Sequence, residues 1–175
     1  MNNGAATPLI TSVCYVRLAV SEPNASARFV SDIFGLQRVA DQNGEIAFRS
    51  DDRFRTVSLG QNSEDGASVG IEVWDDTALE AIGRRLRENG FTVKEASVSD
   101  CRRRYVQSAL LTEDASGNRI DCVVRPTRSG RRYFPPRDAG IVAFHGVGLR
   151  TTEHARDLAF WRALGAEVRD RKSVV

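Results

Sequence analysis

Residues 68–90 read SVGIEVWDDTALEAIGRRLRENG, and this stretch contains the signals of one strand followed by one helix. Its opening part, 68–73, is typical of a β-strand. The sequence Asp75-Asp76-Thr77 then offers side chains that cap the first turn of a helix. Apolar residues recur after it at helical spacing and predict one buried helix face: Leu79, Ile82 and Leu86. Gly90 ends the helix.

Three further strands are predicted after this helix, at 91–95, 108–113 and 119–124. The last two are joined by Asp114-Ala115-Ser116-Gly117-Asn118, a connection rich in turn-forming residues. The chain from 68 to 124 therefore has the order strand, helix, strand, strand, strand.

The same order occurs once before, starting with a predicted strand at 12–20. Asn24 is a suitable N-cap for the helix that follows. Four apolar residues at helical spacing predict its buried face: Ala27, Val30, Ile33 and Phe34. Gly35 stops this helix, because glycine accepts the left-handed conformation at a helix C-terminus.

Three short strands are again predicted, at 36–40, 45–49 and 55–59. The turns between them contain Asn43-Gly44 and Asp51-Asp52, which favour hairpins. An internal repeat of this kind predicts an α+β fold, with an antiparallel or mixed sheet and helices on one side.

A third copy begins after the Arg- and Pro-rich stretch 126–140, which is typical of a linker. A strand is predicted at 141–150, a helix from 151 to the stop at Gly165, and the start of a strand at 166–168. The predicted organisation is a tail at 1–11, a two-copy domain at 12–125, the linker, and an incomplete third copy at 141–175. A lone helix with two strands cannot bury its apolar face, so this segment must dock or fray.

Composition excludes several classes of protein. The net charge of the 175 residues is only +2, and the basic runs 102–104 and 125–137 lack the aromatic spacing that stacks nucleic-acid bases. No apolar run approaches the length of a membrane span, and residues 1–8 lack the layout of a signal peptide. We therefore expect a cytoplasmic protein with no nucleic-acid or membrane partner.

The three cysteines indicate reduced thiols, because the sequence has no CxxC pair and an odd count leaves one unpaired. Cys14 and Cys122 lie in strand-like apolar runs and are expected to be buried. Cys101 is expected to open an Arg-rich loop.

Two stretches of the repeat have a recognisable sequence pattern. One is His145-Gly146-Val147-Gly148-Leu149-Arg150-Thr151 with the later Phe160-Trp161 and Leu164-Gly165; the other is the connection at 114–118 followed by Arg119-Ile120-Asp121. The chain resembles the vicinal-oxygen-chelate superfamily of glyoxalases, bleomycin-resistance proteins and extradiol dioxygenases. It is most similar to the N-terminal part of a two-domain extradiol ring-cleavage dioxygenase. The resemblance implies paired βαβββ modules that form an open, cupped β-barrel with helices outside, followed by an incomplete third module.

The resemblance also implies where a metal would be bound, because family metalloenzymes use a histidine on a module's first strand and a carboxylate on its last. Tyr15 and Val69 hold the histidine positions in the first two copies, and Asp121 holds the carboxylate position. A carboxylate without imidazoles is no metal site. We therefore expect a metal-free first domain in which Asp121 faces solvent.

His145 falls on the position of the first iron ligand in those enzymes. The resemblance implies that an intact parent enzyme uses non-haem Fe(II) and O2 to cleave catechol-like rings, with two further ligands beyond this chain. One imidazole binds a divalent metal weakly, so we expect no stable metal, no assigned catalytic residue and no activity in this chain alone. The simpler alternative is a strand histidine held by a backbone hydrogen bond. His154 is expected on the surface, without a role in a site.

Two other functions stay open. A metal-free binding module of the bleomycin-resistance type would hold a small molecule in a groove lined by Tyr15, Trp74 and Tyr105. A glyoxalase-like isomerase or thiol transferase would need a full ligand set that no complete pair here offers. Apolar residues of the third copy, if uncovered by the first domain, predict self-association: Phe144, Phe160, Trp161 and Leu164.

Overall fold

The computed structural model describes residues 9–39, 44–61, 66–136 and 140–168. Parts of the predicted tail, of the strand at 36–40, of the Asn43-Gly44 turn, of the linker and of the chain after 168 lie outside these residues. The described elements are β1 (Ile10–Ala19), α1 (Pro23–Asp32), β2 (Gln37–Arg38), β3 (Ile46–Arg49), β4 (Val57–Gly60), β5 (Ser68–Val73), α2 (Asp76–Glu88), β6 (Val93–Glu95), α3 (Val98–Arg104), β7 (Ser108–Glu113), β8 (Arg119–Val124) and α4 (His154–Leu164).

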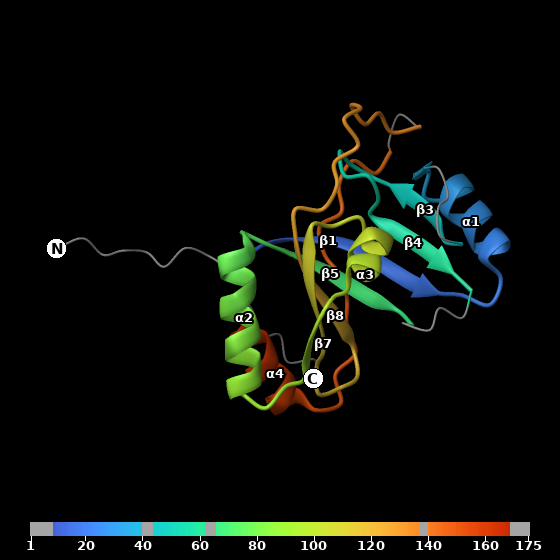
Figure 1. The fold of residues 1–175 in the computed structure, drawn as a ribbon. Helices are drawn as coiled ribbons and strands as arrows, with labels where there is room; N and C mark the ends of the chain where they lie inside the picture. Colours follow the sequence, from blue (N-terminus) through green and yellow to red (C-terminus); the bar gives the residue numbers. More distant parts are fainter. Residues whose placement is uncertain (1–8, 40–43, 62–65, 137–139, 169–175) are drawn as a thin grey trace.

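The described strands form one open mixed sheet in the order β2-β3-β4-β1-β5-β8-β7-β6 (Figure 1). In each module the first strand pairs in parallel with the last, β1 with β4 and β5 with β8. The two first strands, β1 and β5, pair antiparallel at the centre and join the modules. The predicted α+β fold of paired βαβββ modules is therefore confirmed.

The outer face of the sheet is the one that α1, α2 and α4 cover. Side chains alternate between faces along a strand, so β8 sends Ile120, Cys122 and Val124 into the core beneath α2. The predicted face of α2 is correct, with Leu79, Ile82 and Leu86 buried. Asp75 caps this helix by accepting a hydrogen bond from the Ala78 backbone N–H at 2.8 Å, as predicted.

Helix α1 differs from its prediction at both ends. It begins at Pro23, so Asn24 lies inside the helix and no side chain caps it. It ends at Asp32, and Ile33 and Phe34 are 61% and 48% exposed instead of buried. The expected spacing applies only within a continuous helix, and the chain leaves the helix before these two residues.

Helix α3 was missed by the sequence analysis, which placed a loop with Cys101 at its start. Ser97 and Asp100 form a capping box, in which each side chain bonds the backbone N–H of the other residue. Cys101 is buried in this helix, and it packs against Val123 of β8 on the side opposite α2. One helix therefore covers the inner face of the sheet, contrary to the expectation that all helices lie on one side.

The third copy forms its helix but not its strands. Residues 140–150 and 166–168 have no strand partner among the described residues, and a strand without a paired ladder is not stable. Helix α4 packs beside α2 (Figure 1), and Phe160 and Leu164 are fully buried in the core of the second module. The segment therefore docks on the first domain, which removes much of the apolar surface expected to drive self-association.

Gly70 of β5 lies between Tyr15 and Asp121 in the sheet. It pairs with Tyr15 of β1 on one side and Asp121 of β8 on the other. A Cβ atom at this position would lie 2.5 Å from the Tyr15 ring. Only glycine leaves room for this aromatic side chain on the inner face.

We predict that Gly70→Ala destabilises the fold by about 1–3 kcal/mol, because the ring and the β5 backbone must separate. Urea unfolding followed by circular dichroism measures this change. Gly146→Ala is the matched control, since a Cβ there meets nothing within 4 Å. Equal stability of the two variants would contradict the packing argument.

Candidate functional site

The inner face of the sheet carries the candidate site, because it holds Tyr15 and Asp121, which the resemblance placed at two metal-ligand positions. Asp121 is 2% exposed, so the expectation that it faces solvent is wrong. Helix α3 covers it and supplies Arg104. Asp121 would be exposed to solvent only if nothing covered the inner face of the sheet. The sequence analysis did not predict α3, which covers that face.

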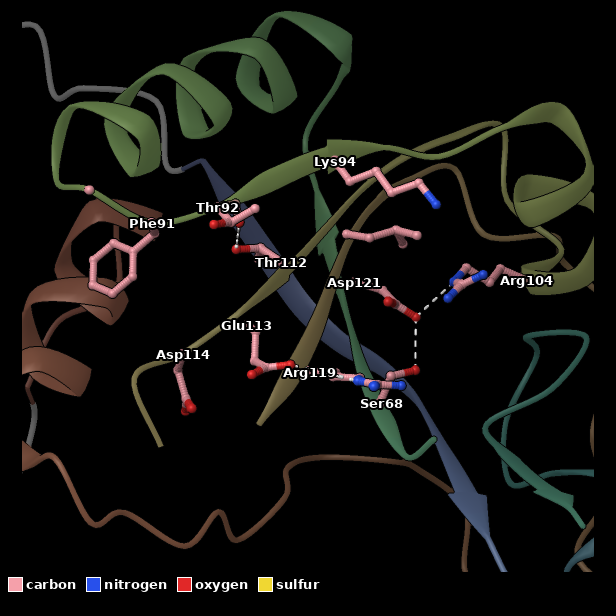
Figure 2. A pocket seen from close by; sticks show the side chains of 12 residues that line it. Ser68, Phe91, Thr92, Lys94, Arg104, Thr112, Glu113, Asp114, Arg119 and Asp121 are labelled. Carbon is pink, nitrogen blue, oxygen red and sulfur yellow. Dashed lines mark hydrogen bonds and ion pairs between the residues drawn. The ribbon is translucent and has the colours of Figure 1, made fainter. Parts of the chain in front are cut away.

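Asp121 binds three donors through one oxygen atom. Its Oδ2 accepts hydrogen bonds from the Tyr15 hydroxyl at 2.8 Å, the Ser68 hydroxyl at 2.9 Å and Arg104 Nε at 3.0 Å. Figure 2 shows the Ser68 and Arg104 contacts at the floor of a pocket. Each of the four residues is at most 3% exposed.

The protonation of Tyr15 follows from this arrangement. Burial, together with the negative charge of Asp121, raises the pKa of the Tyr15 hydroxyl well above its ordinary value. The phenol therefore stays protonated and donates to the carboxylate. A protonated phenol is not a metal ligand.

A second buried cluster lies in the first module and was also missed by the sequence analysis. Glu45 accepts from Arg17 at 2.5 Å and from Arg55 at 2.9 Å, and all three side chains are buried. Arg55 also donates to the Arg103 carbonyl at 2.6 Å, where the end of α3 favours a cation. Its guanidinium lies over the Tyr105 ring at 4.9 Å. The sequence does not predict this cluster, because its residues are far apart in the chain and are brought together only by the folded sheet.

The pKa of Glu45 reflects its two partners. Burial alone would raise this pKa, but the hydrogen bonds and positive charges of Arg17 and Arg55 outweigh burial and lower it. Glu45 is therefore a carboxylate that stabilises the folded state at neutral pH.

An open pocket of about 610 Å³ lies above Asp121 (Figure 2). Ser68, Arg104 and Asp121 contribute to its floor, while Lys94 of β6 and Arg119 of β8 stand at its rim. Leu111 contributes an apolar wall. This volume is in the range of small-molecule sites.

A metal does not fit the side chains of this inner face. Asp121 already accepts three hydrogen bonds, and its neighbours are a phenol that donates and a guanidinium that carries positive charge. Val69, predicted at the second histidine position, points to the outer core; Gly70 is the residue that faces Tyr15 and Asp121. Across the described ranges, no three His, Cys, Asp or Glu side chains gather in a way that could hold a metal ion.

His145 lies apart from both clusters. His145 is exposed in the segment 140–150. His154 is exposed at the start of α4, as predicted. The structure does not bring His145 together with Asp121. Its assignment as a metal ligand stays a prediction.

The connection at 114–118 holds the third copy in place. Asp157 of α4 accepts hydrogen bonds from the backbone N–H of Ser116 at 3.1 Å and from the hydroxyls of Ser116 and Thr151. Asn118 donates to the Arg150 carbonyl at 2.9 Å. The connection at 114–118, one of the two stretches on which the resemblance rests, therefore also anchors the segment that contains His145.

The predicted groove of Tyr15, Trp74 and Tyr105 is not formed. Tyr15 is buried beneath Arg55, and Trp74 is 62% exposed at the end of β5. Tyr105 stacks against Phe54 at 4.5 Å. The thiols are not reactive candidates either, because burial raises the pKa of Cys101 and raises that of Cys122 to about 12.

Comparison with known proteins found relatives but no matching family model. The chain is 27% identical over 165 residues to a 1,2-dihydroxynaphthalene dioxygenase of Pseudomonas sp. (strain C18), covering 86% of this chain and 53% of the relative. It is 25% identical to a 3-methylcatechol 2,3-dioxygenase of Pseudomonas putida F1, covering 89% of this chain and 56% of that protein. The chain spans about half the length of the curated relatives it matches.

Solved structures agree with these relatives. A crystal structure of catechol 2,3-dioxygenase superposes with a TM-score of 0.81 at 25% identity, over 92% of this chain and 57% of that one. A Mn(II)-bound glyoxalase from Novosphingobium aromaticivorans shares the fold, with a TM-score of 0.75 at 16% identity over 91% of this chain and 54% of that one.

The fold is thus that of the vicinal-oxygen-chelate superfamily. Within it, the sequence relatives are extradiol dioxygenases, and the partial coverage is consistent with an N-terminal portion of such a protein. No described helix is both long and apolar enough to cross a membrane.

We predict that the stability difference between wild type and Glu45→Gln narrows as the pH falls below about 4.5, the ordinary pKa of the group. The folded-state pKa of Glu45 is lowered, so its contribution is complete above the unfolded-state value and is lost as pH falls through the folded one. Urea unfolding between pH 7 and 3 measures the difference. Glu80→Gln, on the exposed side of α2, is the control. A constant difference for Glu45→Gln across this range would contradict the ion-pair account.

Proposed function

We propose that this chain is the N-terminal, metal-free portion of an extradiol-type dioxygenase, whose intact form cleaves catechol-like rings with Fe(II) and O2. The observation that carries the proposal is the match to extradiol dioxygenases over about nine-tenths of this chain but only about half of theirs. The boundaries 12–125 for the first domain, 126–140 for the linker and 141–175 for the start of the second belong to this proposal, as does a cytoplasmic location.

The inner face of the first domain supports a structural role. Its two buried carboxylates, Glu45 and Asp121, are bound to guanidinium groups and hydroxyls of the same chain. Their charges are neutralised within the chain, so they need no metal ion to be buried. The domain instead offers a scaffold on which α4 docks.

His145 is the residue of this chain that we assign to the iron site of the intact enzyme. Iron held by two imidazoles and one carboxylate would supply adjacent positions for a catecholate and O2. The other ligands would come from chain beyond residue 175. The role of this chain is to hold the segment with His145 through Asp157, Ser116 and Asn118.

We predict that the purified chain, loaded anaerobically with Fe(II), shows no ring cleavage with catechol, 3-methylcatechol or 1,2-dihydroxynaphthalene. A single imidazole holds iron too weakly for catalysis. Oxygen consumption and the absorbance of the ring-opened product measure activity, and the His145→Ala variant sets the background. Turnover in wild type that His145→Ala lacks would refute the prediction of inactivity. Sedimentation of the same sample tests the self-association predicted from the sequence, which a monodisperse monomer would contradict.

A second candidate function is a metal-free binding module, and the pocket above Asp121 is the observation that favours it. Lys94 and Arg119 at its rim and Leu111 on its wall suit an aromatic ring that carries oxygen substituents. This site differs from the predicted groove, because Tyr15 lies beneath it and Trp74 and Tyr105 lie elsewhere.

Fluorescence titration with catechol in the presence of EDTA distinguishes the two functions. A binding module would show saturable binding that Leu111→Trp weakens at least tenfold, about 1.4 kcal/mol, by filling the pocket. Arg84→Trp, on the exposed side of α2, is the control and should bind as wild type does. Absence of saturable binding, or equal binding by both variants, would exclude this pocket as the binding site.

A further inference from the structure

The inner face contains an internal positive charge at the place where the modules meet. Asp121 comes from β8, and two of its donors come from the central strands: Tyr15 from β1 and Ser68 from β5. The third donor, Arg104, comes from α3 and is the one cation among these contacts. A carboxylate that is 2% exposed is very unfavourable without such a charge nearby.

We propose that Arg104 is a permanent cation that takes the electrostatic place of a metal ion between the two modules and thereby excludes metal from the first domain. A guanidinium remains charged at all ordinary pH values and directs its donors at fixed angles. It neutralises Asp121 without needing imidazole ligands, which this inner face lacks. The inference does not depend on ring cleavage, because every side chain in it belongs to this chain.

The position of Arg104 is set by its helix. The capping box of Ser97 and Asp100 begins α3, and the Asp100 carboxylate lies 3.6 Å from Arg104 Nη1. Burial of Cys101 against Val123 fixes α3 on the inner face. On the same helix Arg102 is exposed whereas Arg104 is buried, so of these two charges that of Arg104 lies on the inner face.

The Glu45 cluster uses the same chemistry in the first module. Its carboxylate is bound by Arg17 and Arg55, both buried. Arg55 also contacts the last turn of α3 through the Arg103 carbonyl. Guanidinium groups therefore neutralise both buried carboxylates of the inner face, and α3 contacts both clusters.

A double-mutant cycle in the full chain tests the proposal. Arg104→Met keeps most of the side-chain volume but leaves the Asp121 charge uncompensated, and should lower Tm by about 10 °C. Arg104→Met with Asp121→Asn removes both charges and should recover more than half of that loss. Arg102→Met is the matched control on the same helix and should leave Tm within about 2 °C of wild type.

Metal binding is measured on the same proteins with Mn²⁺ as the probe, by the electron paramagnetic resonance signal of the free ion. Wild type should not reduce this signal more than Asp121→Asn does, and EDTA should not change its Tm. If Arg104→Met does not fold while the double variant does, the proposal is supported. A double variant no more stable than Arg104→Met, or Mn²⁺ binding by wild type that Asp121→Asn abolishes, would overturn it.

Discussion

The burial of the Asp121 carboxylate is the constraint on which the arrangement of the inner face depends. One oxygen atom accepts hydrogen bonds from β1, β5 and α3, so it connects the two central strands to the helix that covers them. Gly70 must be small for the Tyr15 ring to reach this oxygen, and α3 must be present for Arg104 to neutralise it. Each element is needed because a buried charge tolerates no missing partner.

A second polar contact explains how the third copy is retained without a sheet of its own. Phe160 and Leu164 give α4 its apolar contact with the second module, but apolar burial alone does not fix an orientation. Asp157 supplies that orientation, because it binds Ser116 and Thr151 at the hairpin end. The hairpin thus connects the paired modules to the segment that contains His145.

The sequence was sufficient for those elements that periodicity and turn residues define. Strands β5, β7 and β8 begin and end as predicted, and Asp75 and Gly90 bound α2 as expected.

The errors share a physical cause: they concern residues whose burial or strand pairing is set by partners far away in the sequence. Asp121 appeared exposed because α3 was missed, although Ser97 and Asp100 carried a readable capping signal. Segment 141–150 has strand-like composition but pairs with no strand in the described part of the chain, and Ile33 and Phe34 follow a helix that ends early. For the candidate site, the family resemblance indicated the positions of Tyr15 and Asp121 but not their contact with each other, and the partners Ser68 and Arg104 were not predicted.

The shared oxygen of Asp121 also limits how this domain can change during evolution. A histidine placed at position 15 would leave the carboxylate bound to Arg104, while loss of Arg104 alone would leave an unmatched charge in the core. Each single substitution removes a partner that the other residues of the cluster need, so its cost is lower when the partner changes with it. The two side chains therefore form one unit that is altered safely only as a pair.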